Sequence, residues 1–119
     1  MYLIVEPIVV DEPSQRRQGP AVRVAAHVPD LMDRSRLRST KAEVVLVADP
    51  AELVSLEVDL VVVDLSRPGV LDVLGDIGAH TVGFAAHVDE ELMAAASAAG
   101  CDEVLARSVF FRRFPDFVS

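Results

Sequence analysis

The sequence has a single cysteine, Cys101, no tryptophan and one tyrosine among its 119 residues. One cysteine cannot form an internal disulfide, so this cross-link plays no part in the fold. No apolar run approaches the roughly 20 residues that a membrane-spanning helix requires. The N-terminus also lacks the basic start and the small-residue cleavage site of a signal peptide. We therefore expect a cytoplasmic protein that has no membrane partner.

Basic residues are scarce, because 11 Lys and Arg stand against 19 Asp and Glu, giving a net charge of −8 at pH 7. A surface of this sign repels phosphate groups, so we expect no nucleic-acid partner. The sequence also lacks a P-loop and a glycine-rich dinucleotide fingerprint. We accordingly expect no enzymatic activity, no catalytic residue and no bound cofactor.

Apolar residues make up 51% of the chain, enough to bury the core of one domain. Short β-prone runs alternate with helical segments along the sequence. These runs cover residues 22–26, 44–47, 60–64, 82–85 and 104–106. Alternating strands and helices with short connections predict a parallel sheet that has helices on both faces.

The first helix after residue 26 is expected to open at Pro29, since proline is tolerated at the start of a helix. Its apolar residues predict which side packs on the sheet. The expected inner face comprises Val28, Leu31, Met32 and Ser35.

Residues 1–20 differ from the main domain, which we place at residues 21–119. Tyr2–Val5 and Ile8–Val10 are apolar and β-prone, and a polar linker follows. An exposed segment of this kind would promote aggregation, so we expect an edge strand or an arm, paired in its own subunit or in a homodimer. The alternatives are a loosely ordered tail and a misplaced start codon.

Asp64 follows Leu60–Val63, an unbroken apolar run typical of a strand that is buried on both faces. It should therefore lie at the carboxyl end of a central strand, where ligands collect in open α/β sheets. The alternative is that Asp64 only terminates the strand by bonding to amides of the next loop.

The residues Asp64-Leu65-Ser66-Arg67-Pro68-Gly69 resemble the Asp-Leu-x-x-Pro-Gly pattern of receiver domains in two-component response regulators. Ala99-Gly100-Cys101, followed by Glu103-Val104-Leu105, resembles the fifth-strand region of the same family. The resemblance covers residues 22–117. It implies a flavodoxin-like, doubly wound sheet of order 2-1-3-4-5 in a bacterial signalling protein, with Asp64 as the counterpart of the phosphate-accepting aspartate.

Other positions depart from the family pattern. The acid pair that holds Mg²⁺ in receivers aligns with Ala26 and His27, and the phosphate-contacting Ser or Thr aligns with Ala85 or Ala86. The family's lysine aligns with Arg107, whose planar guanidinium does not reproduce an ammonium group. A chain with these departures resembles an atypical receiver, also called a pseudo-receiver.

Arg107 is expected to form a permanent ion pair with the free Asp64. We therefore predict a stand-alone receiver-like protein that signals through protein–protein contacts without Mg²⁺-dependent phosphorylation. One alternative is a working response regulator that is phosphorylated on Asp64 with the help of Mg²⁺. Another is a transition-metal or enzymatic site formed by His27, Asp64 and His87, since two histidines and a carboxylate can bind such ions.

The last helix is expected over residues 109–117, and it carries the candidate partner face. The resemblance implies that output passes through this part of the fold, and arginines and aromatic residues are favoured interface anchors. The candidate residues are Phe110, Phe111, Arg112 and Arg113. The alternative places both phenylalanines in the core and both arginines in water.

Overall fold

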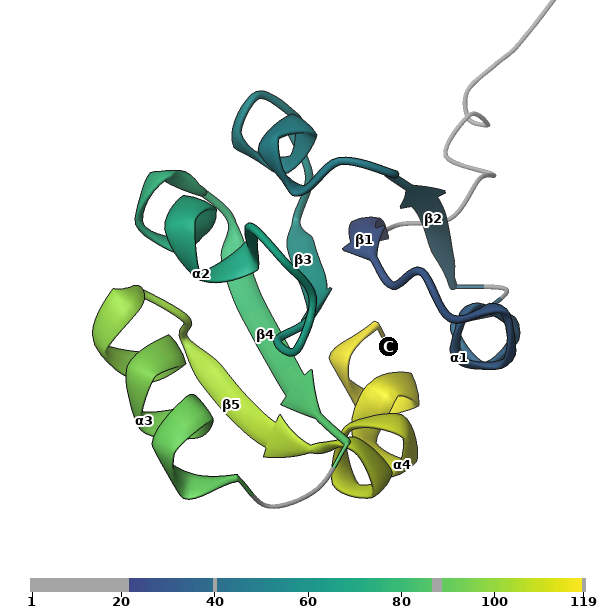
Figure 1. The fold of residues 1–119 in the computed structure, drawn as a ribbon. Helices are drawn as coiled ribbons and strands as arrows, with labels where there is room; N and C mark the ends of the chain where they lie inside the picture. Colours follow the sequence, from purple (N-terminus) through teal and green to yellow (C-terminus); the bar gives the residue numbers. More distant parts are fainter. Residues whose placement is uncertain (1–21, 40, 87–88, 119) are drawn as a thin grey trace, which may run out of the picture.

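Five short runs that each contain valine form the five strands of an all-parallel sheet, ordered β2-β1-β3-β4-β5 (Figure 1). This order confirms the predicted 2-1-3-4-5 topology. The computed structural model describes residues 22–39, 41–86 and 89–118. The strands are β1 (Val22–His27), β2 (Ala42–Leu46), β3 (Leu60–Asp64), β4 (His80–Ala85) and β5 (Glu103–Ala106). The predicted arm and linker at residues 1–20 lie outside the described residues.

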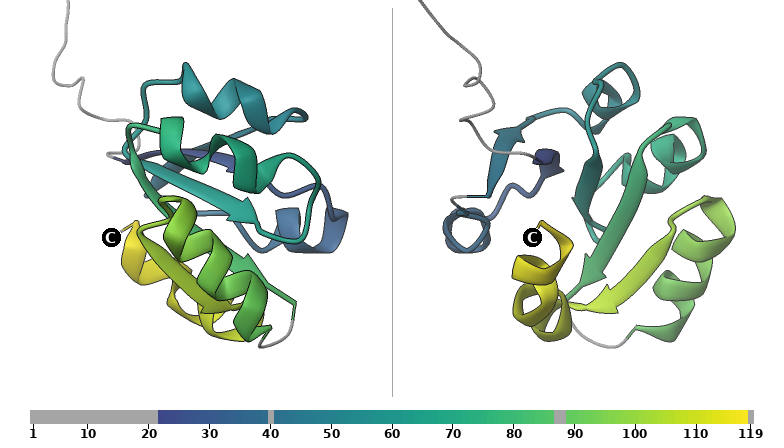
Figure 2. Two further views of the ribbon diagram at one scale, coloured as in Figure 1. Left: turned by 60° about the vertical axis from the view of Figure 1, so that its left-hand side comes forward. Right: turned by 180° about the vertical axis from the view of Figure 1, so that it is seen from behind.

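Helices and 3-10 turns cover both faces of the sheet (Figure 2). They are α1 (Leu31–Ser35), η2 (Pro50–Val54), α2 (Val70–Val73), η3 (Leu74–Asp76), α3 (Glu90–Ala99) and α4 (Arg107–Phe117). The segments η2, α2, η3 and α3 pack on one face, and α1 with α4 packs on the other. Among the described residues, no helix is both long and apolar enough to span a bilayer.

The aromatic core lies on the face covered by α4. The ring of Phe110 is 5.1 Å from the ring of Phe84 and 4.9 Å from that of Phe111, measured between centroids. Phe110 is 0% exposed and Phe111 is 7% exposed. The prediction that these two phenylalanines belong to a partner face is therefore wrong, because α4 directs both of them onto the sheet.

The inner face of α1 also differs from the prediction. Asp30, not Pro29, starts the helix: its carboxylate accepts hydrogen bonds from the backbone N–H groups of Met32 (2.8 Å) and Asp33 (3.0 Å). Leu31 and Met32 are each 76% exposed, whereas Asp33 is buried. A helix of five residues is too short for an apolar pattern to define its inner face, and Asp33 is held inward by an ion pair described below.

Candidate functional site

Asp64 ends β3 at the carboxyl edge of the sheet and is 6% exposed. Its Oδ1 accepts hydrogen bonds from the backbone N–H of Ser66 (3.0 Å) and from the Ser66 hydroxyl (2.7 Å). Its Oδ2 accepts one from Nε of Arg67 at 3.2 Å, which is also an ion pair. Both carboxylate oxygens are therefore already bonded within the loop that follows β3. This agrees with the strand-terminator alternative, to which the structure adds a charged partner.

Arg107 begins α4 directly after β5, and its guanidinium binds Asp33 of α1. Nε lies 3.0 Å from Oδ1 and 3.1 Å from Oδ2 of Asp33, and Nη2 also donates to Oδ1. The prediction that Arg107 pairs with Asp64 is therefore wrong. The side chain of Asp33 is only 4% exposed, so its carboxylate needs a bonded counter-charge more than Asp64 does.

Two arginines, Arg67 and Arg107, and three aspartates, Asp30, Asp33 and Asp64, carry the charges at this edge. The pKa of Arg107 is raised, chiefly because Asp33 accepts its hydrogen bonds, and the charges of Asp33, Asp30 and Asp64 act in the same direction. The pKa of Asp30 is lowered, first by the hydrogen bond from the backbone N–H of Asp33, and also by the charges of Arg107 and Arg67. The carboxyl group of Asp30 is thus held in its ionised form by backbone donors and by the nearby guanidinium groups.

These groups line one small pocket of about 240 Å³. Its charged residues are Asp30, Asp33, Asp64, Arg67 and Arg107, and its remaining residues are Ser66, Phe84 and Ala86. Two of its carboxylates, Asp33 and Asp64, are bonded to guanidinium groups, and Asp30 accepts hydrogen bonds from backbone N–H groups. The two buried carboxylates are therefore not free to bind a cation.

Four residues were predicted to lie at this edge beside Asp64 and Arg107, and only one of them, Ala86, lines the pocket. Ala86 lines it, whereas Ala85 is buried beside Ala106 of β5, so Ala86 occupies the position facing Asp64. Ala26 is 0% exposed within β1. His27 is also buried and does not line the pocket, and its Nδ1 lies 3.2 Å from the carbonyl oxygen of Val47.

Mg²⁺, which the phosphorylation alternative requires, does not fit the described residues. This ion needs several oxygen ligands in near-octahedral geometry. The side chain of Ala26 has no ligand atom, its carbonyl oxygen accepts from the N–H of Val47, and the carboxylates of Asp33 and Asp64 are engaged by Arg107 and Arg67. Within the described ranges, no group of three His, Cys, Asp or Glu side chains could hold a metal ion.

The transition-metal alternative involves one histidine that the structure does not describe. His87 lies outside the described residues, so the set of His27, Asp64 and His87 stays a prediction. Its described members do not meet, because His27 lies against Val47 and Asp64 is bonded to Ser66 and Arg67.

Four residues of the site were missing from the sequence prediction: Asp30, Asp33, Ser66 and Arg67. Asp30 and Asp33 stand three residues apart just after the first strand, a spacing that places both in one helical turn at the carboxyl edge. That signal could have identified them. Ser66 and Arg67 were quoted as part of the motif, but its pattern leaves both positions open.

Comparison with solved structures identifies the fold. The chain is similar to a response regulator from Hahella chejuensis, with a TM-score of 0.68, 15% sequence identity, and coverage of 82% of this chain and 92% of the other. It is also similar to the signal receiver domain of the response regulator NarL from Mycobacterium tuberculosis, with a TM-score of 0.69, 18% identity, and coverage of 83% and 94%. A third similar structure is the phosphorylated cyanobacterial phytochrome response regulator RcpA, with a TM-score of 0.64 and 14% identity over 81% of this chain and 90% of the other.

The similarity covers 81–83% of this chain, and the sheet has the predicted strand order, so the described chain has the fold of a receiver domain. No protein-family model matches the sequence, and no curated protein matches it either.

Proposed function

We propose that this chain is a receiver-like signalling protein of the bacterial cytoplasm that acts through protein–protein contacts and is not phosphorylated with the help of Mg²⁺. The receiver fold supports the signalling class. One observation carries the second part: the two buried carboxylates of the site are already paired, Asp33 with Arg107 and Asp64 with Arg67. The proposal includes no catalytic activity and no cofactor.

Phosphoryl transfer to a carboxylate depends on positioning and on neutralising charge around the transferred group. A nucleophilic oxygen of Asp64 would have to leave its donors, two on Oδ1 and one on Oδ2. Ala86 presents no hydroxyl to a phosphoryl oxygen. Arg107 cannot move toward Asp64 without leaving Asp33 uncompensated in a buried position.

We predict that Asp64 gains no phosphoryl group when the protein is incubated with Mg²⁺ and acetyl phosphate. Loss of one well-placed charge-stabilising group typically costs about 2.7–4 kcal/mol of transition-state stabilisation, and this site departs at several such positions. Intact mass spectrometry under mild conditions measures the outcome, and Asp64→Asn serves as the control. A Mg²⁺-dependent phosphoryl adduct that disappears in Asp64→Asn would refute the proposal and establish the phosphorylated alternative.

The outward side of α4 is the surface we propose for partner contact. Arg112 and Arg113 are both exposed there. Nη2 of Arg113 lies 3.6 Å from Oε1 of Glu103, and its guanidinium stacks on Phe117 at 5.0 Å. Arg112 has no ion pair in the described part of the chain. Of the arginines on α4, it is therefore the one most available to an acidic partner.

Reversing the charge of both residues, Arg112→Glu with Arg113→Glu, is expected to abolish partner capture. The thermal midpoint should stay nearly unchanged, since exposed substitutions usually alter stability by less than about 0.5 kcal/mol. The measurement is a quantitative pull-down from the native cell, followed by a binding assay with the purified partner. Arg38→Glu is the matched control, because Arg38 is likewise exposed and lies beside β2. Capture that survives the double reversal would place the interface elsewhere.

A further inference from the structure

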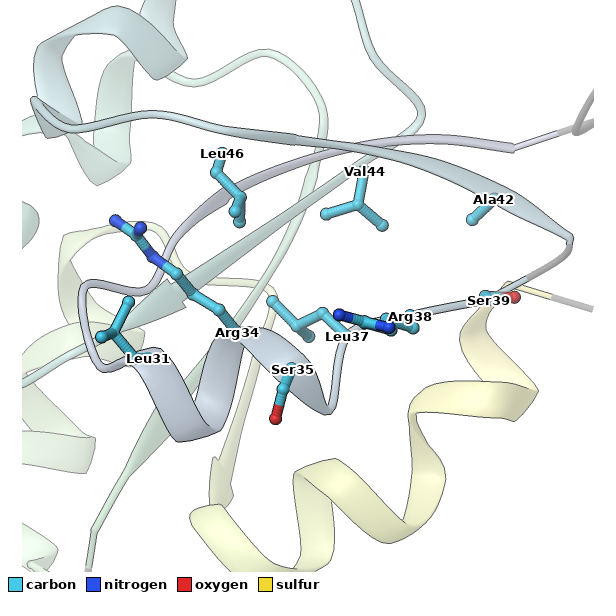
Figure 3. Close-up of a pocket in the computed structure, with 9 residues that line it drawn as sticks. All are labelled: Leu31, Arg34, Ser35, Leu37, Arg38, Ser39, Ala42, Val44 and Leu46. Atoms are coloured by element: carbon cyan, nitrogen blue, oxygen red, sulfur yellow. The ribbon is translucent and has the colours of Figure 1, made fainter.

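A groove of about 440 Å³ runs between α1 and β2 on the face of the sheet that α1 and α4 cover (Figure 3). Leu31 and Leu46 form apolar parts of its walls and are 76% and 44% exposed, and Val44, in the middle of β2, points from the strand toward α1. Arg34 and Arg38 also line it. The groove is open because α1 has only five residues and covers little of the neighbouring strand.

The same groove borders a strand edge that no other described strand occupies, since β2 pairs only with β1. Val22 donates to the carbonyl of Lys41, and Val47 donates to the carbonyl of Ala26, so alternate residues of β2 turn their backbone groups toward β1. Residues 42, 44 and 46 therefore turn their N–H and C=O groups outward, beside the groove. An added strand could bond to this edge and also fill the groove.

We propose that residues 2–10 of the same chain bind this edge as a strand antiparallel to β2, placing apolar side chains in the groove. Tyr2–Val5 and Ile8–Val10 have the β-prone, apolar composition that both features require. Pro7 between them is compatible with an edge strand, where its missing N–H can face solvent.

The linker of residues 11–21 is long enough to join a strand at this position to β1. Val22 lies opposite Ala42, so the chain enters β1 next to the amino end of β2. A site one strand beyond β2 is about 10 Å from β1, whereas the 11 residues 11–21 can span about 36 Å when extended. An antiparallel strand brings residue 10 back to the amino end of β2, where this connection begins. At the effective concentration of such a linker, on the order of millimolar, the segment binds its own chain before a second copy.

Charge also favours this edge over the other free edge of the sheet. Arg34, Arg38 and Lys41 lie at or next to the groove, and the arm carries Glu6 with Asp11 and Glu12 after it. At the opposite edge, the exposed Asp102 lies just before β5 and has the same charge sign as those acids.

A nitroxide spin label on Arg38→Cys tests the placement in the full-length protein. The label reacts with the new thiol in preference to Cys101, which is buried and has its pKa raised to about 11 by burial. Amide signals of residues 2–10 are expected to lose most of their intensity. A label on Glu91→Cys, exposed on α3 near the other edge, should leave them nearly unchanged. Equal effects from both labels, or none from either, would overturn the proposal.

Mixing distinguishes the same chain from a second copy. An isotope-labelled chain without nitroxide is combined with an unlabelled chain that carries the nitroxide at Arg38→Cys. Unchanged signals in the mixture support binding within one chain. Broadening of residues 2–10 in the mixture would show exchange of the segment between copies and refute the intramolecular proposal.

Leu46→Glu tests the groove itself, with Val54→Glu as its matched control. Leu46 and Val54 are 44% and 41% exposed, but only Leu46 lines the groove. Leu46→Glu is expected to raise the hydrogen-exchange rates of the amides of Ala42 and Val44 at least tenfold, with the sheet intact. Val54→Glu should leave them unchanged. Equal rates in both variants would overturn the proposal.

Discussion

Replacing Phe110 with alanine is expected to lower the free energy of unfolding by about 3–5 kcal/mol, the usual cost of removing a buried aromatic ring. Phe110 is 0% exposed and its ring contacts the rings of Phe84, Phe111, Phe114 and Phe117. The cavity left behind cannot easily collapse, because β4 fixes one side of it and α4 the other. Urea denaturation followed by circular dichroism measures the change.

The matched control for Phe110 is Arg112→Ala, two residues later on α4 and exposed. Its effect on stability should stay within about 0.5 kcal/mol. Any loss of partner binding in Phe110→Ala would then follow from unfolding and not from a lost contact. A Phe110→Ala protein as stable as the parent would contradict the core position of this side chain.

Arg107→Ala is expected to destabilise the protein by about 2–3 kcal/mol, somewhat less than the 3–5 kcal/mol typical of a fully buried pair. The reason is that Asp33, with a side chain only 4% exposed, would lose its counter-charge. The smaller figure applies because the Arg107 side chain is 37% exposed and solvent screens part of its charge. Denaturant unfolding of the single variant gives the value.

A double-mutant cycle separates this pair from general packing at the site. Asp33→Ala removes the buried charge, so adding Arg107→Ala to it should cost much less than Arg107→Ala alone. Arg67→Ala, whose partner Asp64 keeps two donors from Ser66, is the comparison and should cost less. Strictly additive effects of Asp33→Ala and Arg107→Ala would mean that the ion pair contributes nothing to stability.

The strands were predictable because their signal is local. A run such as Leu60–Val63 suits a strand buried on both faces and few other structures. The strand order came from the resemblance in the Asp64–Gly69 motif, and the structure confirms it. The orientation of α1 was less predictable, since its exposed residues Leu31 and Met32 are of types usually found in a core.

The partners of the site were not predictable, because ion pairs depend on tertiary geometry. Arg107 was correctly placed at the carboxyl edge, but its partner was taken to be Asp64, the known acid of that edge. The closer acid is Asp33, which reaches the site only because α1 turns it inward. Arg67 was overlooked because the motif around it is defined by Asp64, Pro68 and Gly69.

The Asp33–Arg107 pair also constrains the order in which the protein can fold. Its members are separated by 74 positions in the sequence, and the core on the same face needs Phe110 and Phe114 from the last helix. While the chain is being synthesised, the first helix therefore emerges with an aspartate whose partner has not yet been made. Contacts of such long sequence separation form late and slow folding. Stable closure of this face must wait until nearly the whole domain has left the ribosome.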